Sequence, residues 1–478
     1  MAPGILNKAY SYLKKSVLGN KKKSEEDDEV NDDEEEEVKS QKKSDVFDRK
    51  TTLETVEIFQ LLKQFQKDQD PRKINLLIGA YRNEELQPYP LKIVKEVEPE
   101  IVQNPAYTHE YESITGSELF CDLITKLVLG EGSPAITEKR VTTVQTVAGT
   151  GAMRAGAQYL KILTTRTNVY ISDYSWPCHK PIFLFVGFEN VGSYRYYDHP
   201  RHTLNVPGML CDLLAMPDES IVILHGCAHN PTGLDPTKEE WMQIEKIIKK
   251  KKHLPFFDLA YQGFASGDIE ADAWTIRYFV QQGHQLFIAQ SCSKNFGLYN
   301  ERVGALILVQ ETSKHVSAVM SQMGTVCRCM WSMPPGFGSR IVMEILSNPE
   351  RKARLLTELK SMADRLIRVR KELRNELEKL KTPGDWSYIT QGSGMFFMLP
   401  FTPEQVFYMR TRHSVYFPRN ARISICGLNS GNIPYVAAAI NDTIAASADN
   451  NLRTVGEVSE SQLSIHSPFG KTPIQDTR

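Results

Sequence analysis

Short apolar runs alternate with amphipathic segments through the middle of the chain, and this alternation limits the possible folds more than any other feature. The segments with helical periodicity lie at residues 238–249 and 272–282, and the apolar runs lie at 169–172, 221–225, 254–257, 285–289 and 305–309. Such apolar strands are typical of a mainly parallel sheet that helices cover on both faces. The sequence therefore predicts an α/β fold.

The last third of the chain follows a different pattern. Residues 349–380 carry apolar side chains at i, i+3 and i+4 among alternating charges, and the segment Thr382-Pro383-Gly384 stops this predicted helix. A strand-like run at 394–399 and an alanine-rich helical run at 435–448 follow. This part predicts a smaller α+β domain whose core is completed by residues before Tyr81. We expect the small domain to comprise residues 45–88 and 362–451, and a large domain to comprise 89–361.

The two ends of the chain differ in composition from the rest. Residues 1–23 hold lysines but no acid, an acidic block follows at 25–37, and a lysine-rich patch lies at 39–43. Like charges at this density repel and bury no apolar area, so residues 1–44 and the Ser-, Thr- and Pro-rich tail 452–478 are predicted to be disordered. Residues 1–23 also fit a membrane-surface helix or an organelle-targeting presequence, although they contain no arginine.

Composition excludes several classes of protein. The 478 residues are 41% hydrophobic, which is enough for one large core or two smaller ones. A net charge of -1, from 57 basic and 58 acidic residues, gives no global field for nucleic acid or anionic lipid. No apolar run approaches the roughly 20 residues that span a bilayer, so we expect a soluble protein. The eight cysteines show neither zinc-site nor disulfide spacing, and no metal site is predicted.

Polar residues stand where predicted strands end. Ligands of parallel α/β sheets gather at the carboxyl ends of the strands. Asp258 follows the apolar run 254–257, and Lys294 follows 285–289 within Ser291-Cys292-Ser293-Lys294. Taken alone, such an aspartate is more often a helix cap or turn former, and such a lysine is ordinarily a solvated surface group. The pair therefore needs support from other strand ends.

Three further strand ends supply that support. The strand 141–147 runs into Ala148-Gly149-Thr150-Gly151, an arrangement that points backbone N–H groups and a hydroxyl at an anion. Asn230, after the strand 221–225, places an amide at the same edge, and Trp176, after 169–172, places an aromatic plate there. An anion site, an aromatic plate, an amide, a carboxylate and a lysine are the groups that pyridoxal phosphate requires.

The segment 291–302, SCSKNFGLYNER, resembles the active-site segment of the aspartate aminotransferases, class I pyridoxal-phosphate-dependent enzymes, and the cytosolic type in particular. The similarity extends from about residue 47 to about 448 and includes IGAYR at 78–82, HEY at 109–111, NPTG at 230–233 and DLAYQGF at 258–264. It implies a fold-type I transferase with a large, mainly parallel seven-stranded sheet domain and a smaller α+β domain. It also implies a cytoplasmic location, for which the alternative is mitochondrial.

The resemblance assigns catalytic and cofactor-binding roles. Lys294 would bind the cofactor covalently and then move a proton at the substrate Cα, and Asp258 would pair with the protonated pyridine nitrogen. Tyr261 and Asn230 would contact the ring 3′-oxygen, and Trp176 would stack on the ring. The phosphate would be held by Gly149, Thr150, Ser291, Ser293 and Arg302, and by Tyr111 of the neighbouring subunit.

Substrate binding is assigned mainly to two arginines. Arg422 would bind the α-carboxylate, with room left by Gly79 and further contacts from Trp176 and Asn230. Arg328 of the second subunit would bind the distal carboxylate, which favours dicarboxylic amino and keto acids because an apolar side chain would leave a buried charge unpaired. A homodimer with shared active sites is thereby implied. His179 and His225 would lie behind Asp258, where a purely structural role fits them equally well.

The implied reaction is the reversible exchange of L-aspartate and 2-oxoglutarate for oxaloacetate and L-glutamate. Three positions depart from the family pattern. Met333 replaces a usual asparagine and would loosen selectivity near Arg328, Ala148 lacks a hydroxyl found in some members, and Ala421 replaces a frequent glycine. The alternatives are racemisation or β-decarboxylation on the same cofactor, and a diverged paralogue that acts as a binding or scaffold protein. The complete set of reactive groups favours catalysis.

Overall fold

The computed structural model describes residues 57–448. The predictions for the charged arm 1–44 and the tail 452–478 concern residues outside this range. Two-stranded pairs form between β1 (Ile74–Asn75) and β12 (Val415–Tyr416), β5 (Tyr197–Asp198) and β6 (Thr203–Leu204), and β11 (Phe396–Met398) and β13 (Arg422–Ser424). None of the described helices is long and apolar enough to cross a membrane.

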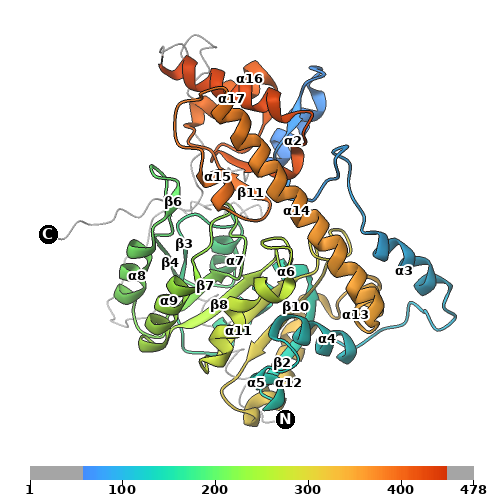
Figure 1. Cartoon of the computed structure of the whole chain (residues 1–478). Helices are drawn as coiled ribbons and strands as arrows, with labels where there is room; N and C mark the ends of the chain where they lie inside the picture. The colour runs from blue at the N-terminus through green and yellow to red at the C-terminus, as the bar shows by residue number, and fades with distance from the viewer. Residues whose placement is uncertain (1–56, 449–478) are drawn as a thin grey trace, which may run out of the picture. The chain divides into compact units, whose positions relative to one another are not determined.

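A seven-stranded sheet lies at the centre of the described residues (Figure 1), in the order β2-β10-β9-β8-β7-β3-β4. The strands are β2 (Val141–Val147), β3 (Asn168–Ser172), β4 (Asn190–Tyr194), β7 (Ile221–His225), β8 (Leu254–Leu259), β9 (Leu286–Ser291) and β10 (Val303–Val309). The pairs from β4 to β9 are parallel, whereas β10 is antiparallel to both of its neighbours. The predicted α/β fold with a mainly parallel sheet is thus confirmed. Strand β4 was not predicted, because this edge strand is mostly exposed and carries no apolar run.

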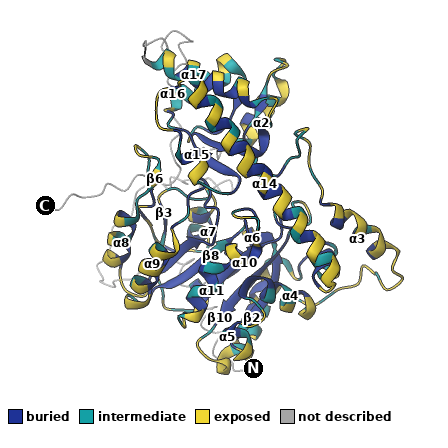
Figure 2. Cartoon of the chain, viewed as in Figure 1, coloured by how far each residue is buried: buried dark blue, intermediate teal, exposed yellow. Residues whose placement is uncertain are grey.

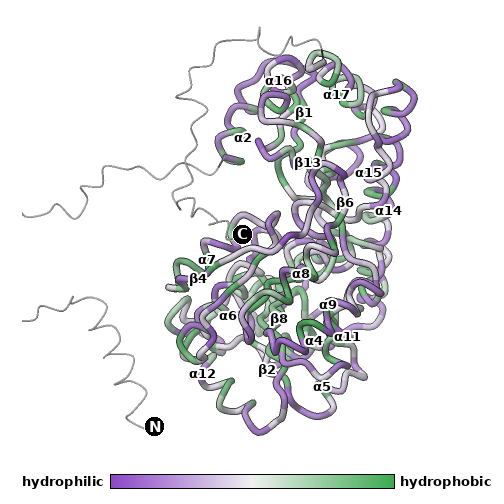
Figure 3. The backbone as a smooth tube through the Cα atoms, turned by 90° about the vertical axis from the view of Figure 1, so that its left-hand side faces the viewer, coloured by the Kyte–Doolittle hydropathy of each residue, from purple (hydrophilic) through white to green (hydrophobic). Residues whose placement is uncertain are grey.

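Alternate residues of the central strands enter separate cores on the two faces of the sheet. Ile223 and Phe256 belong to one buried cluster, and their neighbours Val222 and Phe257 belong to the other. The strands are accordingly dark blue in Figure 2, and β8 is hydrophobic in Figure 3. This burial on both faces is the physical reason why the strands read as continuous apolar runs.

Helices cover both faces of the sheet. On one face lie α6 (Ala148–Leu163), α7 (His179–Phe185) and α12 (Val316–Trp331), whose apolar residues join the cluster of Ile223. The other cluster includes residues of α4 (Glu118–Leu129), α8 (Val206–Ala215), α9 (Lys238–Lys250) and α11 (Trp274–Gln281). The remaining short or peripheral helices are α3 (Lys92–Gln103), α5 (Pro134–Thr137), α10 (Ile269–Asp272), η1 (Ser313–His315) and α13 (Gly336–Leu346).

The 31-residue helix α14 (Pro349–Lys379) leads from the sheet region to the C-terminal elements. It begins where the Asn348 side chain accepts hydrogen bonds from the N–H groups of Glu350 and Arg351, and where Pro349 occupies the first turn. The C-terminal elements are α15 (Tyr388–Gln391), α16 (Pro403–His413), η2 (Ile425–Gly427) and α17 (Ile433–Ala448), and α2 (Glu57–Lys67) contacts β1 and β12. The domain boundaries at 88 and 361 stay a prediction.

Candidate active site

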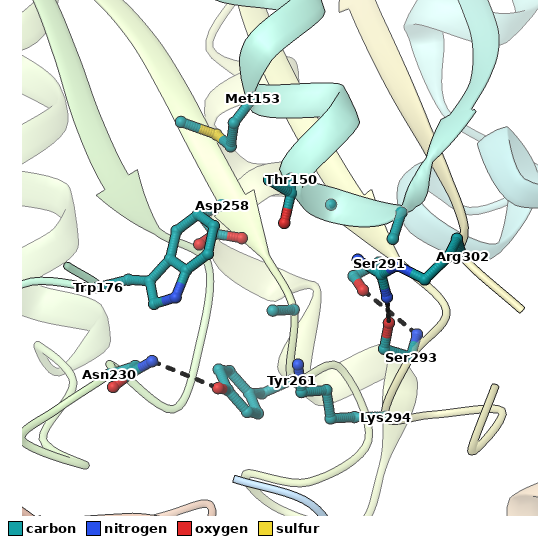
Figure 4. Close-up of a pocket in the computed structure, with 13 residues that line it drawn as sticks. Thr150, Met153, Trp176, Asn230, Asp258, Tyr261, Ser291, Ser293, Lys294 and Arg302 are labelled. Atoms are coloured by element: carbon teal, nitrogen blue, oxygen red, sulfur yellow. Dashed lines mark hydrogen bonds between the residues drawn. The ribbon is translucent and has the colours of Figure 1, made fainter. Parts of the chain in front are cut away.

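The strand ends enclose a recess of about 500 Å³ that is open to solvent. Ten of the predicted site residues line it, and in Figure 4 the side chains of Trp176, Asp258, Tyr261 and Lys294 border a common space. The ten are Gly149, Thr150, Trp176, Asn230, Asp258, Tyr261, Ser291, Ser293, Lys294 and Arg302. Since the parallel strands β3, β7, β8 and β9 all end here, the recess lies where α/β sheets place their ligands.

Lys294 and Asp258 face this recess from neighbouring strands. Asp258 is the last residue but one of β8, paired with His225 and Ala289, and Lys294 follows the end of β9. The Lys294 ammonium lies 5.3 Å from the ring centre of Tyr261. Burial lowers the pKa of Lys294 to about 8, an effect that Arg302 strengthens and Asp258 opposes. The amine therefore reaches its neutral, nucleophilic form near physiological pH.

A chain of hydrogen bonds supports Asp258 from behind. Nε2 of His179 donates to the carboxylate at 3.1 Å, the Ser175 hydroxyl donates to Nδ1 of His179 at 2.8 Å, and Nε2 of His225 donates to Ser175 at 3.3 Å. The backbone N–H of Asn230 donates to Nδ1 of His225 at 3.4 Å, so one choice of tautomers satisfies every link. Burial lowers the pKa of His225 to about 3, which keeps this ring neutral.

The pKa of Asp258 is lowered although burial alone would raise it, because the hydrogen bond from His179 and the positive charge of Lys294 outweigh burial. The carboxylate is thus ionised throughout the neutral range. A buried anion of this kind can hold a cationic partner across the recess. The sequence suggested that His179 and His225 lie behind Asp258, and the structure places them there.

Donors for an anion converge at the opposite end of the recess. Helix α6 begins at Ala148, so Gly149 and Thr150 lie in its first turn, where free backbone N–H groups and the helix dipole favour negative charge. Arg302 donates to the Ser293 hydroxyl at 3.4 Å, and the Ser293 N–H donates to Ser291 at 3.2 Å (Figure 4). These groups suit a phosphate.

Arg422 lies at the edge of the recess beside Asn230. Its guanidinium donates to the Asn230 side chain at 3.4 Å and to the carbonyl of Leu77 at 2.7 Å, while its buried Nε has no hydrogen-bond partner among the described residues. Its charge lies 4.4 Å from the ring centre of Phe396. A Cβ added to Gly79 would lie 2.4 Å from the same ring, so this site has no room for a side chain at position 79.

Four predicted site residues are not among those that line the recess: Gly79 and Arg422, which lie at its edge, and Tyr111 and Arg328. Tyr111 is 83% exposed, and Arg328, on α12, is exposed as well. Tyr111 and Met333 instead line a separate surface groove, where the Met333 sulfur accepts a hydrogen bond from the N–H of Glu112. Neither Tyr111 nor Arg328 therefore completes the recess of its own chain.

Several neighbours of the site were not predicted from the sequence. Met153 and Ala260 also line the recess, and Phe396 packs beneath Arg422. Met153 lies on the buried face of α6, a periodicity that was present in the sequence. The departures Ala148 and Ala421 both have positive φ values, of 55° and 60°, a conformation that glycine adopts at lower cost.

The residues present fit pyridoxal phosphate. The Nε of Arg422, which has no partner among the described residues, suits a substrate carboxylate. The ionised Asp258 suits the pyridinium of the cofactor, and the Lys294 amine, with its lowered pKa, suits the aldehyde. The start of α6 and Arg302 provide for a phosphate. Each group of the cofactor and its substrate thus has a chemically matched partner in one recess.

The rate at which cofactor-free protein takes up pyridoxal phosphate covalently is expected to rise with pH and to level off above about pH 8. With a pKa of about 8, roughly one fifth of Lys294 is neutral at pH 7.4, against about one in a thousand for an ordinary lysine. Stopped-flow absorbance between pH 6 and 10 measures this rate. A rate that still rises tenfold for each pH unit above pH 9 would contradict the assignment.

Comparison with known proteins agrees with this geometry. Residues 71–440 match the family model described as aminotransferase class I and II. The chain is 45% identical to the cytoplasmic aspartate aminotransferase of Gallus gallus, over 81% of this chain and 96% of that protein. The aspartate aminotransferase from Saccharomyces cerevisiae cytoplasm has a TM-score of 0.81 at 37% identity, covering 84% and 98% of the two chains.

A second solved structure carries the cofactor. It is an aromatic-amino-acid aminotransferase from Burkholderia pseudomallei covalently bound to pyridoxal phosphate, with a TM-score of 0.81 at 36% identity over 84% of this chain and all of that one. Enzymes named for two different substrates thus match at nearly the same level, so the fold alone does not select the substrate. The extent of the family match shows that the chain belongs to the class I and II aminotransferases.

Proposed function

We propose that this protein catalyses the reversible transfer of an amino group between L-aspartate and 2-oxoglutarate, giving oxaloacetate and L-glutamate. The proposal depends on one observation: Lys294, Asp258 and the hydrogen-bond donors that suit a phosphate all line one recess, and Arg422 lies at its edge. The cytoplasmic aspartate aminotransferase of Gallus gallus, at 45% identity, supports the choice of substrate. The same relative supports a cytoplasmic location.

Each side chain of the recess has a separate role in the proposed reaction. Pyridoxal phosphate, when bound, supplies an aldehyde that condenses with amines and a ring that accepts electrons from the substrate Cα. Lys294 holds the cofactor between turnovers, and its Nζ then removes the proton from the substrate Cα. Asp258 stabilises the positive charge at the ring nitrogen. Arg302 and the first turn of α6 hold the phosphate.

Tyr261, Asn230 and Arg422 form a connected group on the substrate side. Asn230 donates to the Tyr261 hydroxyl at 3.5 Å and accepts from Arg422 at 3.4 Å. In the proposal, Tyr261 and Asn230 contact the ring 3′-oxygen, Trp176 stacks on the ring, and Arg422 binds the α-carboxylate. Burial lowers the pKa of Arg422, and a carboxylate near its free Nε would offset the cost of desolvating this charge.

Selectivity for a second carboxylate requires a cation that is not already engaged with the cofactor. Among the residues that line the recess of one chain, the two cations are Lys294 and Arg302, and both are assigned to the cofactor. We assign this role to Arg328 from a second copy, with Tyr111 of that copy at the phosphate. Both residues are exposed in the described chain and are therefore available to a neighbour. The proposed assembly is a homodimer with shared active sites.

Purified protein is expected to convert aspartate with 2-oxoglutarate at least about 100-fold more efficiently than phenylalanine with 2-oxoglutarate, measured as kcat/KM. The reason is that an apolar ring would leave the Arg328 guanidinium desolvated and unpaired. Oxaloacetate and glutamate are measured by chromatography. Comparable efficiency with phenylalanine would contradict the substrate assignment.

Omitting 2-oxoglutarate separates this reaction from its alternatives. Transamination of aspartate alone ends after one equivalent of oxaloacetate per active site. Multiple turnovers to alanine would instead show β-decarboxylation, and multiple turnovers to D-aspartate would show racemisation. A protein without visible absorption and without spectral response to aspartate would support the scaffold alternative.

A further inference from the structure

Arg370 is a buried arginine on α14 to which the proposed reaction gives no role. Its side chain is only 2% exposed, whereas the neighbouring Arg374 forms a surface ion pair with Glu378 at 2.6 Å. Burial lowers the pKa of Arg370 to about 10, with Asp235 opposing, so the group is still charged at neutral pH. A desolvated charge persists where specific partners offset the cost, and these partners indicate its role.

The partners of Arg370 are carbonyl groups of α15, of the segment that follows it and of the first residue of β11. Its Nη1 donates to Ile389 at 2.8 Å, and its Nη2 donates to Ser393 at 2.8 Å, to Gly394 at 3.2 Å and to Phe396. A planar guanidinium can hold several carbonyls in a fixed geometry, which the single ammonium of a lysine cannot reproduce. Arg370 thus fixes the backbone of the turn 393–396.

The loop that carries Asn230 fixes the same turn from the other side. The Ser393 N–H donates to the Gly233 carbonyl at 2.7 Å, and the Ser393 hydroxyl donates to Asp235 at 3.3 Å. Gly233 has a φ of 69°, and a Cβ there would lie 2.2 Å from the Phe396 carbonyl oxygen and 3.0 Å from Nη2 of Arg370. The loop, the turn and the guanidinium are therefore in direct contact.

The turn 393–396 places the ring of Phe396 on the substrate side of the recess. The ring of Phe396 is 2% exposed, lies 4.4 Å from the Arg422 guanidinium, and meets Tyr261 edge-on with ring centres 6.0 Å apart. A guanidinium over an aromatic face is attracted by the ring quadrupole and is restricted in orientation. A displacement of the turn would accordingly displace the surface on which Arg422 rests.

We propose that Arg370 is a positioning residue for the carboxylate site: it holds the turn 393–396 so that Phe396 keeps the Arg422 guanidinium in the orientation that receives the substrate. The inference rests on the proposed function, because it assumes that Arg422 binds a carboxylate. It adds a residue outside the recess on which substrate affinity depends. Cofactor binding is not expected to depend on it, since neither Arg370 nor the turn lines the recess.

The test compares Arg370→Met and Arg370→Lys with the control Arg374→Met. Arg374 lies one turn further along α14 and contacts Thr390 of α15, but it does not contact the turn 393–396. The dissociation constant of succinate, a dicarboxylate without an amino group, is measured by titrating the cofactor absorbance of the holoenzyme. We expect both Arg370 variants to weaken succinate binding and to raise KM for aspartate by about 10- to 100-fold, with an unchanged cofactor spectrum. The control is expected to match the wild type.

Phe396→Leu tests whether the Phe396 ring orients the Arg422 guanidinium, and this test does not depend on how well the Arg370 variants fold. It is expected to weaken succinate binding to a similar extent, and the effects of Arg370→Lys and Phe396→Leu should not be additive, because both act through one ring. Hydrogen exchange in peptides covering residues 392–398 should become faster in the Arg370 variants and not in the control. A Phe396→Leu enzyme with wild-type succinate affinity would overturn the proposal. So would additive effects of Arg370→Lys and Phe396→Leu on succinate binding, or Arg370 variants that lose thermal stability but keep wild-type succinate affinity. Failure of the wild type to bind succinate would instead contradict the proposed function.

Discussion

Replacement of Lys294 by alanine is expected to lower kcat for aspartate and 2-oxoglutarate by at least about 10⁴-fold. The substitution removes the only amine among the residues that line the recess, and with it the group that we propose to bind the cofactor covalently and to act as the base at the substrate Cα. Steady-state rates measured by oxaloacetate formation give this ratio. Treatment with borohydride, followed by mass spectrometry, should label wild-type protein at Lys294 and leave the variant unlabelled.

Lys352→Ala is the matched control, because Lys352 lies on α14 and does not line the recess. It is expected to keep wild-type activity and labelling. The Lys294→Ala protein should keep a wild-type circular dichroism spectrum, since the residue is not a member of either apolar core cluster. If this variant retained more than a few per cent of the wild-type rate, another group would have to be the base.

The same variant tests whether active sites are shared between two chains. In a mixed dimer of Lys294→Ala and Arg328→Ala chains, one site contains both substitutions, whereas the other has a wild-type lysine from one chain and a wild-type arginine from its partner. Random mixing of subunits should therefore restore about a quarter of the wild-type activity. If Arg328 acted within its own chain, every site of the mixed dimer would lack one group and the mixture would stay inactive.

The parts of the fold that follow from local pattern were predicted closely. The bounds 141–147 and 221–225 are those of β2 and β7, and the long helix predicted at 349–380 is observed at Pro349–Lys379. These elements have strong periodicity or clear stop signals. The antiparallel direction of β10 could not be predicted in this way, because an apolar run carries no information about the direction of its neighbours. The exposed edge strand β4 lacked an apolar signal altogether.

Some residues of the site could be predicted from the sequence, whereas others could be identified only in the tertiary structure. Lys294 follows β9 and Asp258 lies near the end of β8, so their convergence could be inferred from sheet topology. Arg370 could not be singled out in this way, because α14 carries many basic residues and only the packed structure shows which of them meet carbonyl groups. A weak signal was present: Arg370 lies four residues after Leu366 and three before Leu373, on the buried face of the helix.

Asp258→Asn is expected to lower kcat by at least about 10³-fold while the fold and the covalent attachment at Lys294 are kept. The amide has nearly the shape of the carboxylate, but it carries no charge to stabilise a protonated ring nitrogen. His179 and Lys294 hold the pKa of Asp258 below its usual value, so the wild-type carboxylate is ionised at neutral pH and its loss is a loss of full charge. Asp173→Asn, which also changes a carboxylate after a parallel strand but lies outside the recess, is the control and should keep most of the activity.

The charge explanation can be separated from a change in shape by altering the cofactor instead of the protein. In Asp258→Ala, the cavity left by the carboxylate can accept pyridoxal phosphate methylated at the ring nitrogen, where the positive charge is permanent. If Asp258 acts by maintaining that charge, the variant should react at least about 10-fold faster with the methylated cofactor than with pyridoxal phosphate. The wild type should react more slowly with the methylated cofactor, because its carboxylate leaves no room for the methyl group. If the methylated cofactor gave the variant no advantage over pyridoxal phosphate, Asp258 would have to act by orienting the ring, together with the hydrogen-bonded histidines behind it.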